Sequence, residues 1–465
     1  MATTSMPRPH RWRAPRRSVI LGAALLVGVG SYGAGYLATR HDAASPATAA
    51  QPAAQVPIPG GPPAVVTQSL DQIDGAINVW AANLARDDKD FVSATYLADL
   101  YYSRARLTGN LDDYGRAKQA VDLALAAYPG GVGAQLLRAQ LLFATHDFVK
   151  ARDSAQAIQA ANPDQVAALA TVGDAQLELG QYDAAARSFN ELARRAPGPA
   201  VTARLAHLAA LRGQPANADA LAARAIREAA VAGTAPVDRS WYEYLAGYLA
   251  FQFGELTSAE RHFRIAVADW PGSYLALAGL AKTRAAQNAT GEAINLYQKA
   301  IAIVPQPEFL ARRGDLYTLR AAAGDAKRAS DDYATVEAIA KLAGEAAGVY
   351  DRTLALYLAN HGLEPARAIA LAQTELEVRK DVYGYDAAAW ALLAGGQAAD
   401  AEVMIGRALA VGTRDAKVLY HAGMIATVLG RTDEARSFLT DSLALDPTFD
   451  PLQVARARAT LAGLK

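Results

Sequence analysis

The sequence contains no cysteine among its 465 residues. This absence excludes disulfide bonds, thiolate metal sites, cysteine nucleophiles and the lipid-modified cysteine of a bacterial lipoprotein. It leaves the compartment open, because a chain without thiols is compatible with an oxidising environment as well as a reducing one.

The chain also lacks an excess of positive charge outside its N-terminus. Lys+Arg and Asp+Glu both number 46, and six arginines precede the first acidic residue, Asp42, so the remainder of the chain is mildly acidic. A mildly acidic body without blocks of Lys and Arg does not attract a phosphate backbone. Nucleic acid is therefore not an expected partner.

Motifs that carry catalysis, metal binding or cofactor binding are missing too. The sequence has no His-Glu-x-x-His, no Gly-rich phosphate loop followed by Lys-Ser/Thr, and no Gly-x-Ser-x-Gly. The seven histidines are isolated from one another. Two of them, His146 and His361, fall at expected turns between helices, where a solvated or capping side chain is the ordinary role. We expect no metal, no cofactor and no enzymatic activity.

Aromatic residues are few, at 8% of the chain, whereas hydrophobic residues reach 52%, with alanine prominent among them. Small side chains of high helix propensity suit closely packed helices rather than a β-rich core. The composition predicts an all-α fold.

The N-terminus carries the only long hydrophobic run. Five arginines lie within residues 8–17, and Val19 to Leu37 then runs for 19 residues without a charge, long enough as a helix to cross a hydrocarbon core of ~30 Å. We divide this region into a basic cytoplasmic tail (1–18), a membrane anchor or export signal (19–38) and an Ala/Pro-rich linker (39–66).

Retention of the apolar run as a single-pass anchor is favoured by its length, although Ala47-Thr48-Ala49 would serve as a cleavage site for a signal peptide. The positive flank predicts that the rest of the chain lies outside the cytoplasm in either case. The protein is therefore expected at the cell membrane, or exported if the segment is cleaved.

The body of the chain repeats itself every 34 residues. Pro129, Pro163 and Pro197 are separated by this interval, as are Pro271 and Pro305. Gly396 and Gly430 show the same spacing near the C-terminus. A fixed period of this length is the signature of a stacked repeat architecture.

Each period has the same internal order of small and large residues, and the copy from Gly173 to Pro197 shows it best. Gly173 lets two helices cross closely, Gly180 forms the turn between them, and Phe189 fills the space beneath the next unit. Pro197 ends the second helix. Related copies contain Gly247, Gly254, Ala259, Phe263 and Pro271; Ala281, Ala293, Tyr297, Ala300 and Pro305; and Gly423, Gly430, Ala435, Leu439 and Pro447.

These spacings resemble those of the tetratricopeptide repeat (TPR) family, in a bacterial protein with an N-terminal anchor or export signal. The resemblance covers nearly all of the chain from residue 67 onward. It implies a right-handed superhelical solenoid of about ten helix pairs in residues 67–447, with a capping helix in 448–465. The pairs are expected to begin near residues 91, 132, 166, 199, 240, 274, 307, 348, 382 and 416, after a first helix that contains Ile73, Ile77, Trp80 and Leu84.

In the family, the first helix of each pair lines a concave surface where extended peptides or partner helices bind. Trp241, Tyr244, Tyr248 and Phe251 fall on one face of such a helix and make up the aromatic stripe, our main candidate for partner binding. The alternative is that these rings only fill space between repeats. Helical phase adds Trp390 and Tyr420 as candidates, and, less strongly, Gln140, Phe143, Asp174, Leu177, His207, Lys282, Asp315, Arg352 and Met424.

Two functions remain open at this stage. The favoured one is a non-catalytic extracytoplasmic scaffold that binds protein or peptide partners in its concave groove. The alternative is a factor that captures a polymer for exopolysaccharide or envelope assembly, since aromatic rings also stack on sugars. An enzyme with an added repeat domain is disfavoured because the repeats leave no room for a second fold.

Overall fold

The computed structural model describes residues 70–343 and 351–464, and all of their regular structure is α-helical. The basic tail, the membrane segment and the linker predicted within residues 1–66 lie outside the described residues. Within the part of the chain that is described, no helix is both long enough and apolar enough to cross a bilayer.

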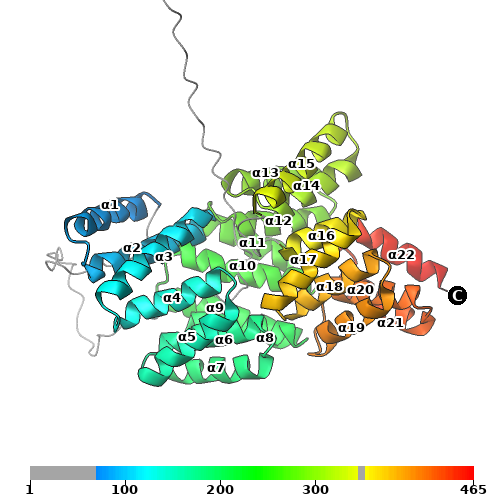
Figure 1. Ribbon diagram of the computed structural model, residues 1–465. Helices are drawn as coiled ribbons and strands as arrows, with labels where there is room; N and C mark the ends of the chain where they lie inside the picture. Colours follow the sequence, from blue (N-terminus) through cyan, green and yellow to red (C-terminus); the bar gives the residue numbers. More distant parts are fainter. Residues whose placement is uncertain (1–69, 344–350, 465) are drawn as a thin grey trace, which may run out of the picture.

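The helices form ten antiparallel pairs, framed by α1 (Leu70–Arg86) and α22 (Gln453–Gly463) (Figure 1). The first helices of the pairs are α2 (Phe91–Thr108), α4 (Val132–Ala144), α6 (Val166–Glu178), α8 (Pro199–Leu211), α10 (Pro236–Gln252), α12 (Tyr274–Ala286), α14 (Pro307–Arg320), α16 (Asp351–His361), α18 (Val382–Ala394) and α20 (Ala416–Val428). The second helices are α3 (Leu111–Ala127), α5 (Phe148–Ala161), α7 (Tyr182–Arg195), α9 (Pro215–Val231), α11 (Leu256–Asp269), α13 (Thr290–Ile303), α15 (Asp325–Ala343), α17 (Pro365–Val378), α19 (Ala398–Leu409) and α21 (Thr432–Leu445).

The observed helix starts agree closely with the 34-residue spacing. Eight of the ten first helices begin at the predicted residue, from Phe91 in α2 to Ala416 in α20. The exception within the described residues is α10, which begins at Pro236 instead of near 240, because proline is well suited to the first turn of a helix. The start predicted near 348 falls in the undescribed residues 344–350, and α16 is described from Asp351.

Small residues permit the close crossing within each pair, as their spacing predicts. A Cβ atom added to Gly173 on α6 would overlap the ring of Phe189 on α7, and one added to Gly247 on α10 would overlap the ring of Phe263 on α11. Phe189 and Phe263 are both fully buried. Each phenylalanine ring thus fills the space that a side chain at the facing glycine would occupy. The two helices can pack this closely only because glycine has no side chain.

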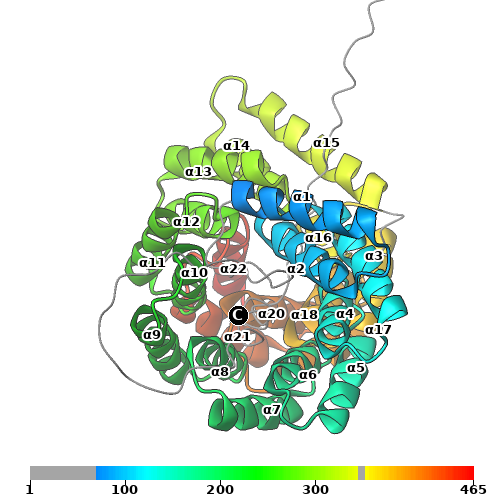
Figure 2. The same cartoon turned by 90° about the vertical axis from the view of Figure 1, so that its left-hand side faces the viewer.

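The stack of pairs curves until later pairs reach earlier ones. In Figure 2 the helices from α1 to α14 follow a ring, and α16 to α22 lie behind it. The turns after three first helices meet the ends of second helices, or the loops that follow them, five pairs further along the chain. Gly180 meets Lys380, Gly213 meets Gly412, and Gly254 meets Leu445, in each case at the carbonyl oxygen of the later residue. These three contacts form what we name the inter-turn seam.

The seam contains polar contacts as well as close backbone approach. The amide of Lys380 donates to the carbonyl oxygen of Glu178 at 3.0 Å, and the amide of Val382 donates to the hydroxyl of Tyr182 at 2.8 Å. The guanidinium of Arg379 lies 2.7 Å from a carboxylate oxygen of Glu178. Successive turns of the superhelix therefore bind each other directly.

The end of the array is covered by α22, within the segment where a capping helix is predicted. Val454 and Ala457 of α22 are buried in a cluster with Tyr420 of α20 and Leu439 of α21. A stacked array needs such a cover because its last pair has no following unit to bury its apolar side.

A pair of glycine substitutions separates the effect of the seam from that of an ordinary turn. Gly180 and Gly430 both have a left-handed backbone, with φ of 71° and 74°. A Cβ at Gly430 would meet open space, whereas one at Gly180 would strike Lys380. We expect Gly430→Ala to cost about 1 kcal/mol and Gly180→Ala to cost a further ~1–3 kcal/mol from overpacking, as measured by urea denaturation. Equal losses in the two variants would show that the seam does not contribute to stability.

Candidate functional site

The inner surface of the superhelix encloses a cavity of about 290 Å³. The helices that line it are α6, α8, α10, α12, α14, α16, α18 and α20, all of them the first helices of their pairs. Loop residues before α18, α20 and α22 complete the wall. The assignment of the concave surface to the first helices, implied by the family resemblance, therefore holds for these pairs.

The aromatic stripe of α10 faces this cavity. Trp241, Tyr244, Tyr248 and Phe251 all line it, and the outermost two, Trp241 and Phe251, are buried. Tyr242 does not line the cavity; it packs with α8 and α9 in a cluster that also contains Trp241. The helical phase of the stripe is thus confirmed, and four rings from one helix form a continuous apolar wall.

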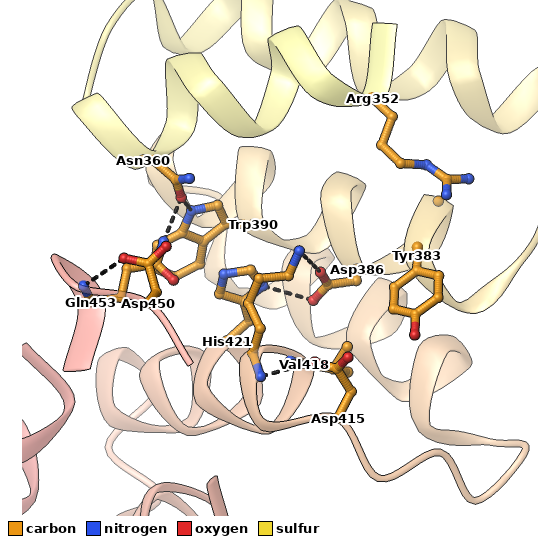
Figure 3. A network of polar contacts seen from close by, with 12 residues as sticks. Arg352, Asn360, Tyr383, Asp386, Trp390, Asp415, Val418, His421, Asp450 and Gln453 are labelled. Carbon is orange, nitrogen blue, oxygen red and sulfur yellow. Dashed lines mark hydrogen bonds and ion pairs between the residues drawn. The ribbon is translucent and has the colours of Figure 1, made fainter. Parts of the chain in front are cut away.

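Trp390 and Tyr420 lie elsewhere, because α22 and the loop before it cover them. Both are buried in a cluster with Phe449, and neither lines the cavity. Figure 3 shows the indole nitrogen of Trp390 directed at Asn360, to whose side-chain oxygen it donates at 2.8 Å. The Trp390 ring also stacks on His421, with ring centroids 4.1 Å apart. These contacts give Trp390 and Tyr420 a place in the core that joins α18, α20 and α22.

The less strongly predicted positions divide in the same way. Leu177, His207, Lys282, Asp315 and Arg352 line the cavity. Gln140, Phe143, Asp174 and Met424 do not line it. Asp174 instead forms a buried ion pair with Arg204, at 2.8 Å.

Histidines contribute more to the structure than the sequence suggests. The expectation of a solvated or capping role for His146 is wrong, because its ring is buried, stacks on Phe148 and lies 3.2 Å from a guanidinium nitrogen of Arg379. His361 does contact a carbonyl oxygen of its own helix, as a capping side chain would. Its other ring nitrogen lies 2.8 Å from Asp315 across the cavity wall.

Ion pairs within one helix pair and between distant pairs border the cavity. Arg352 contacts Asp381 at 2.5 Å and Glu375 at 3.0 Å, and Arg312 pairs with Asp450 in the loop before α22. These partners could not be matched from the sequence, since Arg312 and Asp450 belong to pairs that are far apart along the chain. The cavity residues Glu308, Asp381, Asp415 and Asp446 were also missed, because they lie at helix starts and in loops, outside the helical phase used for the prediction.

The cavity combines an apolar wall with a few polar groups, an arrangement that binds a ligand and fixes its orientation. Burial raises the pKa of the Tyr248 hydroxyl to about 12, and this hydroxyl shares a hydrogen bond with Tyr383. Among the described residues, no cluster of three or more His, Asp or Glu side chains is arranged to hold a metal ion.

The fold and its inner cavity define a helical-repeat solenoid whose first helices line an internal cavity. A family model described as tetratricopeptide repeat matches residues 102–166, 244–306 and 387–448. These three segments of the chain are therefore similar to tetratricopeptide repeats. Comparison with curated protein sequences gives no match.

Solved structures of repeat proteins resemble the chain at low identity. A human IFIT1 dimer with PPP-AAAA is 15% identical, with 81% of this chain and 87% of that chain covered and a TM-score of 0.45. PilW, a type IV pilus biogenesis factor, is 20% identical, with 45% and 93% covered and a TM-score of 0.38. A tetratricopeptide repeat protein from Parabacteroides merdae ATCC 43184 is 16% identical, with 59% and 99% covered and a TM-score of 0.32. None of these likenesses indicates a ligand for this chain.

Two cavity histidines predict opposite responses to acid. Burial lowers the pKa of His207 to about 4 from its ordinary 6.5, against a weaker opposing effect of Asp381. Its stabilising contribution is therefore complete above pH 6.5 and is lost as the pH falls towards 4. Burial also acts to lower the pKa of His361, but its bond to Asp315 outweighs that effect and raises the pKa. The contribution of His361 is therefore complete below pH 6.5 and is lost at higher pH.

We expect the unmodified protein to lose about 2 kcal/mol through His207 between pH 7 and pH 5. His207→Gln should reduce the acid-induced fall in the urea midpoint, and His361→Gln should enlarge it. The two variants and the unmodified chain are compared by circular dichroism at both pH values. An unchanged pH response in His207→Gln would contradict the burial of a neutral imidazole.

Proposed function

We propose that the protein is a non-catalytic scaffold that binds a segment of a protein partner against the aromatic stripe on the inner face of its superhelix. The observation that carries this proposal is the position of Trp241, Tyr244, Tyr248 and Phe251 on the cavity wall. Tryptophan and tyrosine contribute most to binding when a partner removes them from water in a concave site.

The size of the cavity supports a short contact segment. About 290 Å³ is near the lower end for pockets that enclose small ligands. A few side chains of a partner fill such a space, whereas a long extended peptide requires a groove that runs along the superhelix.

We further propose that the repeat array acts outside the cytoplasm, held by the N-terminal segment. The support is the sequence itself: five arginines in residues 8–17 are followed by the uncharged run from Val19 to Leu37. A positive flank of this kind stays in the cytoplasm and directs the following chain across the membrane. Capture of an exopolysaccharide is the second candidate function, supported by the same aromatic rings.

Substitution of the two central tyrosines tests partner binding. Tyr244→Ala combined with Tyr248→Ala in the full-length chain should weaken capture of the partner by about 30-fold, since hot-spot residues contribute about 2 kcal/mol or more. Tyr128→Ala is the matched control, because Tyr128 is 50% exposed and lies outside the cavity. Partners are identified by affinity capture and mass spectrometry, and helicity is checked by circular dichroism.

The outcome separates the candidate functions. If the double tyrosine variant still captures the partner, the role of the aromatic stripe is refuted. The role is also refuted if partner capture is lost only because the array unfolds. Binding of glycans in place of proteins favours polymer capture.

A further inference from the structure

Most charged side chains at the cavity are neutralised by a partner from the protein itself. Arg312 pairs with Asp450, Arg379 with Glu178, and His361 with Asp315. Pairing of this kind is expected, because a charge removed from water without a partner is costly. A polar group at the cavity that lacks a partner is therefore a candidate contact for a ligand.

Lys282 of α12 is the first exception. It lines the cavity, yet it forms no hydrogen bond or ion pair with any residue that the structure describes. Its ammonium group lies 4.3 Å from the centroid of the Phe251 ring, at one end of the aromatic stripe. A cation over an aromatic face is attracted by the ring quadrupole, but it keeps its capacity to donate hydrogen bonds to an anion.

Charges of both signs surround Lys282. Burial is the main cause that lowers the pKa of Lys282 to about 8, and repulsion by Arg312 and Lys417 adds to it. Glu308 and Asp415 act in the opposite direction without forming an ion pair with the ammonium group. A bound carboxylate would compensate for the desolvation of this lysine.

Glu308 and His207, which also line the cavity, likewise lack partners within the described part of the chain. Glu308, in the first turn of α14, is half-buried and forms no hydrogen bond or ion pair there. His207 of α8 is only 7% exposed and forms none either. Lys282, Glu308 and His207 thus offer a cation, an anion and a neutral imidazole on three different helices.

The aromatic stripe of α10 supplies the apolar surface of the same space. Tyr248 and Phe251 line the cavity together with Lys282, Glu308 and His207. Opposite charges beside an apolar wall are complementary to a molecule that carries both charges and an apolar group.

We propose that the inner cavity binds a small zwitterion of the amino-acid or dipeptide class, with its carboxylate at Lys282, its ammonium group at Glu308 and its apolar side chain on the aromatic stripe. His207 donates or accepts a hydrogen bond at the polar part of the ligand. The inference goes beyond the proposed scaffold function, since a free zwitterion binds without any protein partner. The volume of about 290 Å³ accommodates such a molecule within the enclosed space.

Isothermal titration calorimetry on the full-length protein tests the proposal with four probes. L-phenylalanine and L-alanyl-L-phenylalanine carry both charges, L-phenylalaninamide lacks the carboxylate, and N-acetyl-L-phenylalanine lacks the ammonium group. We expect one or both zwitterions to bind at least about tenfold more tightly than the two blocked compounds. Absence of binding by both zwitterions at millimolar concentration overturns the proposal, and so does equal affinity for a blocked compound.

Variants assign each charge of the ligand to its residue. Lys282→Met should weaken binding of the zwitterion at least about tenfold and remove its advantage over the amide. Glu308→Gln should remove the advantage over the N-acetyl compound. Lys299→Met is the matched control, because Lys299 of α13 is exposed and lies outside the cavity. An equal effect of Lys282→Met and Lys299→Met, with native helicity in both, refutes the assignment to Lys282.

The two proposals fail in different ways. If no zwitterion binds but the tyrosine variant loses partner capture, the scaffold function is supported and the proposed ligand is refuted. If zwitterion binding depends on Lys282 but partner capture is unchanged in the variant that lacks Tyr244 and Tyr248, the proposed partner site is refuted and the proposed ligand is supported.

Discussion

The architecture depends on contact between successive turns of the superhelix. Gly180, Gly213 and Gly254 occupy turns where no side chain fits, since a Cβ at any of them would lie against a carbonyl oxygen five pairs later. All three have positive φ values, a conformation that glycine adopts without strain. One residue type therefore satisfies two requirements at each point, the sharp turn within a pair and the close approach of the next superhelical turn.

Closure of the superhelix converts part of the concave surface into the wall of a partly open cavity. In an open solenoid the first helices face a groove that is continuous with solvent, and their charges are screened. Here later pairs pack against earlier ones, so charges on the inner face lose much of their hydration. Pairing between turns, as in Arg379 with Glu178 and Arg312 with Asp450, compensates for that loss. Lys282, Glu308 and His207 are left without such compensation from the described residues.

Much of the fold could be predicted from the spacing of single residues. Each helix pair is a local unit, so glycine at the crossing, glycine at the turn and proline after the second helix mark its limits within 34 residues. The aromatic stripe was predictable for the same reason, because four rings on one helix share a face by geometry alone. Helical phase did not predict the positions of Trp390 and Tyr420 correctly. Both lie on first helices, but α22 and Phe449 cover their side chains. Position on a helix does not reveal which later element will pack against it.

The sequence by itself determined the all-helical fold, the repeat length, the helix starts and the aromatic face of α10, because all of these depend on interactions between residues close together in the chain. Only the tertiary structure decided that the superhelix closes, which residues line the cavity and which charges find partners. Small differences in packing angle accumulate over five pairs before two turns meet. A local sequence pattern does not reveal these accumulated packing angles. Which polar groups on the inner surface contact one another is therefore decided only in the complete array.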